Sequence, residues 1–225
     1  MVRSTKIYGA LSADIVDSTS LPVYELKQMQ EEMQIVLHKI EGTSRHLWWR
    51  IVRGDTVECL TEYPGSILRV ALALKCYMKY WFSASGASAE SKEFVLRYSI
   101  GIGTMRYFRE GDNFIDGPAI YLSGRNLDSM RDGSYAAFDC DTKNDDFVNL
   151  LDLSLNLVDS IVNEMSAKQA IVIYYKILGA PEKIIARELG LSQPAINLRA
   201  NLGGWNRIKK SLSVFENLNY ENYVC

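Results

Sequence analysis

Three aspartates in the first quarter of the chain have the residue type and the setting of metal ligands. Asp14 follows an apolar stretch with the pattern of a buried strand, Asp17 comes three residues later, and Asp55 ends an Arg53-Gly54-Asp55 turn between two short apolar runs. If that strand and hairpin lie side by side in one sheet, the carboxylates converge on one or two Mg²⁺ or Mn²⁺ ions. The alternative is structural, because aspartate at strand ends and turns often bonds backbone amides.

A second group with chemical potential lies in the middle of the chain. Tyr121 and Arg125 stand four residues apart in a helical pattern, and therefore on one face, where an arginine can clamp a phosphate. An ordinary surface arginine is the alternative. Gly101 and Gly103 leave one face of an expected strand without side chains, so that a ligand or another backbone can approach it closely. A β-bulge explains the two glycines equally well.

A third group, near the C-terminus, has the spacing of a helix-turn-helix. Residues 182–189 have a helical pattern, Gly190 supplies a sharp turn, and Ser192 is a good N-cap for a second helix. Residues 168–210 contain eight basic and two acidic residues, the local basicity that phosphate contact requires. A small helical bundle that makes only protein contacts is the alternative. The expected DNA-contacting residues on or capping the second helix are Ser192, Gln193, Asn197, Arg199 and Asn201.

The overall composition limits the classes of protein that fit. The chain has 225 residues, 48% of them hydrophobic, and a net charge of -2, so any DNA contact must be local. Four scattered cysteines and two histidines disfavour a zinc site or a disulfide framework. The apolar start is broken by Asp14 and Asp17, unlike a signal peptide, and no apolar stretch approaches the roughly 20 residues that span a bilayer. We expect a cytoplasmic protein with no membrane partner and no organic cofactor.

The elements that must position these groups follow the order β-α-ββ-α-β-α-(β). This order predicts an α+β, ferredoxin-like or palm-like domain, with a mostly antiparallel sheet and helices on one face. An acidic cluster from residue 139 to 146 marks its end. We expect a palm domain at 1–142 and a small all-α domain at 147–225, with the helix-turn-helix at about 182–201. The expected strands are 6–13, 46–52, 56–60, 93–105 and 135–138, the expected helices are 22–42, 64–82 and part of 116–130, and a loop is expected at 83–91.

Four motifs carry a resemblance to a known family. SADIVDST, VRGDTVECL, SIGIGTM and DGPAIYLSGR, in this order and spacing, resemble the SatD family, whose C-terminal part is likewise a helix-turn-helix like residues 165–199 here. The first three-fifths of the chain more distantly resembles the class III nucleotide cyclase palm. That resemblance implies that Asp14 and Asp55 bind metal and that Arg125 stabilises the pentavalent phosphate. The positions that depart from the cyclase pattern, two purine-reading sites and the arginine's asparagine partner, are Ile51, Phe114 and Tyr121.

Together these features favour a DNA-binding transcriptional regulator. The helix-turn-helix would read double-stranded DNA while the cyclase-like domain senses a nucleotide or a metal, or dimerises. A homodimer is expected, because cyclase-like palms commonly pair and Tyr80, Trp81 and Phe82 in succession cannot all face one core. The alternative is a metal-dependent nucleotidyl cyclase or related phosphoryl-transfer enzyme acting on nucleoside triphosphates. A scaffold whose two modules only mediate contacts is the third possibility.

Overall fold

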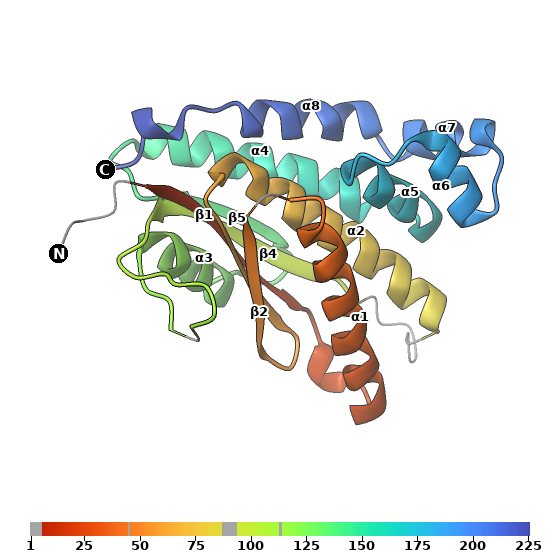
Figure 1. The fold of residues 1–225 in the computed structure, drawn as a ribbon, viewed down its shortest axis with the longest axis horizontal. Coiled ribbons are helices and arrows are strands. Elements are labelled where there is room, and N and C mark those ends of the chain that lie inside the picture. Colours follow the sequence, from red (N-terminus) through yellow and green to blue (C-terminus); the bar gives the residue numbers. More distant parts are fainter. Residues whose placement is uncertain (1–5, 45, 87–93, 113) are drawn as a thin grey trace.

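The protein has an α+β palm-like fold built on a mixed five-stranded sheet (Figure 1). The computed structural model describes residues 6–44, 46–86, 94–112 and 114–225. The sheet order is β2-β3-β1-β4-β5, with β1 at its centre. Only the β4–β5 pair among these neighbours is parallel. The strands are β1 (Ile7–Ile15), β2 (Leu47–Arg53), β3 (Thr56–Thr61), β4 (Leu96–Thr104) and β5 (Ala136–Cys140).

Helices cover both faces of the sheet, which corrects the expectation of helices on one face. α1 (Val23–Glu41) and α2 (Ile67–Ser85) pack on one side, and α3 (Pro118–Asp128) packs on the other. Side chains alternate along a strand, so Leu11 of β1 joins the α1–α2 core, whereas its neighbour Ala10 joins a smaller core under α3. The centre of the sheet is therefore buried on both faces.

The close packing of α3 on β4 explains why positions 101 and 103 are glycines. A Cβ atom on Gly101 would lie 2.2 Å from the Ala119 carbonyl oxygen and 2.7 Å from the Ser123 backbone nitrogen. A Cβ atom on Gly103 would lie 3.1 Å from the Ala119 nitrogen. Of the possibilities left open by the sequence, the structure shows the close approach of another backbone.

Two expected boundaries were wrong. β1 does not stop before Asp14 but continues to Ile15, because Asp14 pairs in register with Arg97 of β4, which neutralises its charge. α2 runs through residues 83–85, which were expected to be loop, and Gly86 ends the helix in the left-handed region at φ 69°. The rest of that expected loop, residues 87–91, lies outside the described residues.

The C-terminal helices pack against the palm. α5 lies on α2, α4 lies on β5 and α2, and α8 contacts the 3₁₀ turn before α2. Residues of α4, α5 and α8 belong to the same hydrophobic cluster as the α1–α2 face of the sheet. Within the described ranges, no helix combines the length and the apolarity needed to cross a membrane. The bounds are α4 (Asp145–Asn163), α5 (Ala167–Ile177), α6 (Glu182–Leu189), α7 (Gln193–Leu202) and α8 (Trp205–Glu216).

Candidate functional site

Asp14 is held by an arginine on the neighbouring strand. Arg97 Nε donates to Asp14 Oδ1 at 2.6 Å, and Arg97 Nη2 donates to Asp14 Oδ2 at 2.8 Å. Both side chains are partly buried. This two-point geometry is the strong, orientation-specific form of an arginine–carboxylate pair. Both carboxylate oxygens of Asp14 are therefore engaged by one guanidinium.

Asp55 reaches the same end of β1 from the β2–β3 turn. Its Oδ2 accepts a hydrogen bond from Ser18 Oγ at 2.6 Å and a longer one from the Ile15 backbone nitrogen at 3.3 Å. Gly54 precedes it with a φ of 44°, a left-handed conformation that glycine adopts without strain. The hairpin thus places Asp55 against the residues that follow Asp14, and its carboxylate bridges the hairpin to the chain leaving β1.

Asp17 lies just beyond the strand, in a left-handed conformation with a φ of 61°. It occupies the N-cap position of a 3₁₀ turn without a side-chain capping hydrogen bond, and its side chain is exposed. Within the part of the chain that the structure describes, no three or more His, Cys, Asp or Glu side chains are grouped so that they could hold a metal ion. With Asp14 bound by Arg97, the donor set in this arrangement does not fit the Mg²⁺ or Mn²⁺ expected from the sequence.

Arg97 is the central charge of this site, and sequence reasoning missed it. Its pKa is raised, first by the hydrogen bond to Asp14 and further by the negative charges of Asp14, Asp55 and Asp128, while burial acts in the opposite direction. Arg97 is thus the counter-ion of Asp14, and the charges of Asp55 and Asp128 shift its pKa in the same direction. The signal that could have found it is one charged residue in the otherwise uncharged stretch 94–105.

Arg125 is exposed on α3, and its guanidinium lies over the ring of Tyr121 in the same helix. Its guanidinium carbon lies 5.5 Å from the ring centroid of Tyr121, which confirms the expectation that the two share a face. Arg106 lies 5.4 Å from the same ring. Among the described residues, no hydrogen bond or ion pair joins Arg125 to Asp14 or Asp55. The structure does not bring the expected catalytic arginine into contact with the expected metal ligands.

The two positions that would read a purine in a cyclase carry apolar side chains here. Ile51 is half-buried and packs against the main core. Phe114 is exposed, and its ring centroid lies 5.6 Å from that of Tyr107. Neither side chain offers a hydrogen-bonding group to a base.

The helix-turn-helix is formed by α6 and α7, with α5 as the third helix of its core. Gly190 ends α6 with a φ of 64°, and the Leu191 backbone nitrogen donates to the Ala186 carbonyl at 2.8 Å. Ser192 then caps α7, its Oγ accepting from the Ala195 backbone nitrogen at 3.4 Å. The sequence placed α6 at the same residues. The buried residues shared by the three helices are Val172, Ile185, Ala186, Ile196 and Ala200.

Three of the expected DNA-contacting side chains of α7 are exposed, namely Gln193, Asn197 and Asn201. Asn201 Nδ2 donates to Asn197 Oδ1 at 2.9 Å, which orients the Asn197 amide. Arg199 was also expected to be exposed but is half-buried. The reason is its position three residues after the buried Ile196, which puts it on the flank of the packed face.

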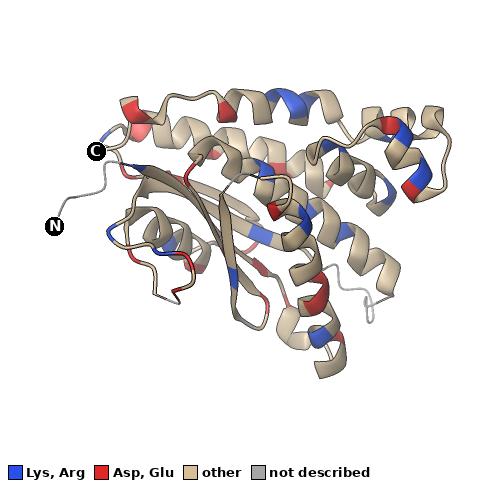
Figure 2. Cartoon of the chain, in the orientation of Figure 1, with Lys and Arg blue, Asp and Glu red and all other residues tan. Residues whose placement is uncertain are grey.

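Charge near the helix-turn-helix is mixed rather than uniformly basic (Figure 2). α6 carries exposed Lys183 and Arg187, but also Glu188, whose carboxylate lies 3.2 Å from Arg187. α8 adds a run of exposed basic residues with Lys209 and Lys210. These exposed lysines therefore lie on the two helices that flank α7 in sequence.

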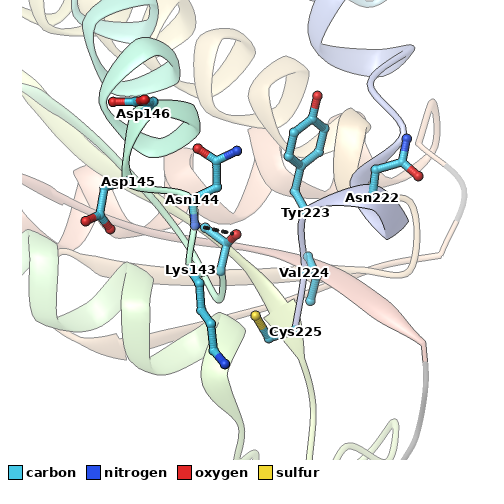
Figure 3. A pocket seen from close by; sticks show the side chains of 9 residues that line it. Lys143, Asn144, Asp145, Asp146, Asn222, Tyr223, Val224 and Cys225 are labelled. Atoms are coloured by element: carbon cyan, nitrogen blue, oxygen red, sulfur yellow. Dashed lines mark hydrogen bonds between the residues drawn. The ribbon is translucent and has the colours of Figure 1, made fainter.

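A hollow of about 710 Å³ lies between the start of α4 and the last residues of the chain. Figure 3 shows Asn144 and Tyr223 on its two sides, with Lys143 and Asp145 pointing away from Tyr223. The Tyr223 ring stacks on Phe147 at 3.8 Å. Because α4 follows the far end of β5, the hollow is remote from Asp14 and is a separate feature of the surface.

The palm has structural relatives but no match among family models or curated proteins. A bacterial light-regulated adenylyl cyclase is 15% identical, with a TM-score of 0.43 over 59% of this chain and 74% of that chain. The guanylate cyclase domain of RhGC from Catenaria anguillulae is 13% identical, with a TM-score of 0.39 over 56% and 73%. The GGEEF domain of a diguanylate cyclase from Vibrio cholerae is 14% identical, with a TM-score of 0.36 over 60% and 83%. Each of these solved structures is similar to this chain at low sequence identity, over 56–60% of this chain.

Proposed function

We propose that the protein is a DNA-binding transcriptional regulator, in which α6 and α7 form the DNA-contacting unit. The observation that carries the proposal is the three-helix core of α5, α6 and α7, which holds α7 with its amide side chains exposed. In this motif class the second helix enters the major groove and its first residues contact base edges. The resemblance of the sequence to the SatD family, whose C-terminal part is also a helix-turn-helix, supports the same function.

The side chains of α7 suggest which base atoms would be read. Asn197 Oδ1 already accepts a hydrogen bond from Asn201, so its Nδ2 group is available as a donor. A donor matches the N7 and O6 acceptors that purines present in the major groove. Gln193, at the first position of α7, has both a donor and an acceptor and fits an adenine edge. Exposed lysines of α6 and α8 would contact the phosphates.

Fluorescence anisotropy with a library of genomic fragments tests this proposal. We expect at least one fragment to bind, with an affinity that falls steeply as salt is raised. Asn197→Ala should weaken binding to that fragment by roughly 5- to 150-fold, the equivalent of about 1–3 kcal/mol. Arg131→Ala, which removes an exposed charge from the palm, is the matched control and should bind normally. Absence of salt-sensitive binding, or equal binding by Asn197→Ala, contradicts the proposal.

A homodimer is the assembly that such a reader needs, because two half-sites one helical turn apart require two reading helices. The expected contact at Tyr80–Phe82 has little free surface, since Phe82 is buried and stacks on Phe94. α4 instead exposes Leu150, Leu153 and Leu157, each between 58% and 63% accessible, on one face. We propose that the dimer contact lies there. Leu153→Glu/Leu157→Glu should convert a dimer to a monomer in light-scattering measurements, and an unchanged mass contradicts this contact.

The enzymatic alternative depends on Asp14, Asp55 and Arg125 acting together on a metal-bound nucleoside triphosphate. The engagement of Asp14 by Arg97 weighs against it. Incubation with Mn²⁺ and each of the four triphosphates, followed by product separation, is the direct test. A cyclic nucleotide and released pyrophosphate that both disappear in Asp55→Ala would favour the enzyme over the regulator. Binding of a nucleotide without turnover would be compatible with a sensory palm.

A further inference from the structure

We propose that Arg97 is a built-in cation that takes the place of a divalent metal ion at the carboxylates of Asp14 and Asp55. The palm is then charge-balanced without Mg²⁺ or Mn²⁺. This inference concerns the palm alone and does not depend on DNA binding. It rests on three observations: the strand register, the arrangement of the carboxylates and the nature of the pairing.

The strand register places Arg97 opposite Asp14 independently of side-chain flexibility. β1 and β4 pair over nine consecutive positions, from Ile7 opposite Thr104 to Ile15 opposite Leu96, with Asp14 directly opposite Arg97. Directly paired residues of antiparallel strands have their Cβ atoms about 4.5–5.5 Å apart on the same face. A slip by one residue would exchange the side chains of β1 between the α1–α2 core and the smaller core under α3. The backbone therefore holds the guanidinium at Asp14.

Arg97 pairs directly with Asp14, and the carboxylate of Asp55 is held near the end of the same strand. Arg97 donates two hydrogen bonds to Asp14. Ser18 holds the carboxylate of Asp55, whose negative charge raises the pKa of Arg97. Asp128, the last residue of α3, does the same. A divalent ion shared by Asp14 and Asp55 would have to sit against this guanidinium, which like-charge repulsion opposes. The guanidinium of Arg97 already supplies the positive charge that a metal ion would otherwise supply to Asp14.

The pairing also predicts what happens when Arg97 is neutralised. Asp14 would then lose its counter-ion and regain two free oxygens, at the end of β1 against which Asp55 is held. Oxygen-rich clusters of this kind are the sites that Mn²⁺ and Mg²⁺ favour. Loss of Arg97 should thus create a divalent-metal site that the natural chain lacks.

Mn²⁺ titration of the full-length, metal-stripped protein is the experiment. Bound and free Mn²⁺ are separated by electron paramagnetic resonance, and the melting temperature is recorded in the same samples. We expect the natural protein to bind no stoichiometric Mn²⁺ and to melt at the same temperature with or without it. Arg97→Gln should melt lower in chelator, bind one Mn²⁺ and regain stability. Arg97→Gln/Asp14→Asn should lose that binding.

Arg125→Gln is the matched control, because it removes an exposed arginine elsewhere on the palm and should gain no Mn²⁺ site. Stoichiometric Mn²⁺ binding by the natural protein that is lost in Asp14→Asn overturns the proposal. So does a folded Arg97→Gln variant that binds no Mn²⁺. If Arg97→Gln does not fold, Arg97→Lys, which keeps the charge, replaces it: it should bind no Mn²⁺, and binding by it overturns the proposal. The DNA-binding assay is independent of these outcomes, so the two proposals fail separately.

Discussion

Lys75 Nζ lies 2.6 Å from Asp159 Oδ1, and this ion pair joins the palm to the C-terminal helices inside the core. The two side chains are only 2% and 4% exposed. Asn163 Nδ2 donates to the second carboxylate oxygen at 2.8 Å, and the ring of Tyr98 lies 5.5 Å from the ammonium group. Burial lowers the pKa of Lys75, while the charge of Asp159 and the hydrogen bond to it act in the opposite direction. This ion pair therefore links α2 to α4, and removing one of its two buried charges lowers the free energy of unfolding.

Breaking this pair should destabilise the fold severely. Lys75→Met leaves the Asp159 charge buried without a partner, and we expect a loss of about 3–5 kcal/mol of unfolding free energy. Lys75→Met/Asp159→Leu removes both charges and should recover much of that loss. Urea denaturation followed by circular dichroism measures both variants. Equal destabilisation of the single and double variants would show that the lost packing, not the orphaned charge, dominates.

Gly101→Ala should force α3 away from the sheet. Its Cβ would lie 2.2 Å from the Ala119 carbonyl oxygen, a backbone atom that cannot rotate aside. Overpacking of this kind costs about 1–3 kcal/mol or more. Gly124→Ala in α3, whose new Cβ meets nothing within 4 Å, is the control and should stabilise by about 0.4–1 kcal/mol. Thermal melting of the two variants compares them, and similar melting temperatures would contradict the close packing.

Gly190 should tolerate only residues that adopt the left-handed conformation. At a φ of 64° an alanine costs about 1–2 kcal/mol, even though its Cβ would meet no atom within 4 Å. Asparagine, which visits this conformation more readily, should cost less. We expect Gly190→Ala to weaken DNA binding by loosening the turn between α6 and α7, and Gly190→Asn to preserve it. Chemical denaturation and anisotropy on the same samples separate stability from affinity.

Asp116 should titrate below the ordinary pKa of an aspartate. Its pKa is lowered from the ordinary value of 3.8, first by the hydrogen bond from the Tyr121 hydroxyl and then by Arg106. A lowered pKa in the folded state contributes stability that is present above the unfolded-state pKa and lost as pH falls through the folded-state value. Tyr121→Phe should move the pKa of Asp116 back toward 3.8, as followed by carboxyl NMR. Tyr107→Phe, which removes a hydrogen bond to Asp112 instead, should leave it unchanged.

Local signals in the amino-acid sequence determine much of the fold. The helix-turn-helix can be located from them: a glycine able to adopt positive φ, a serine cap three residues before the amide it bonds, and a helical repeat of apolar residues. The Gly54-Asp55 turn can be located for the same reason, since flanking strands and turn residues are neighbours in the chain. Where a conformation depends on residues within about one helical turn, composition and spacing are sufficient.

Only the tertiary structure decided what the aspartates do. Arg97 and Asp14 are 83 residues apart, and which strand lies beside β1 is set by the packing of the whole sheet rather than by either residue. The same holds for α3, which lies on the second face because Gly101 lets its backbone approach there. The sequence by itself indicated that Asp14 lies near the end of a strand and that Asp55 lies in a hairpin turn. The cross-strand register depends on residues far apart in the sequence, and it brings Arg97 to Asp14. An arginine therefore balances the charge of that carboxylate.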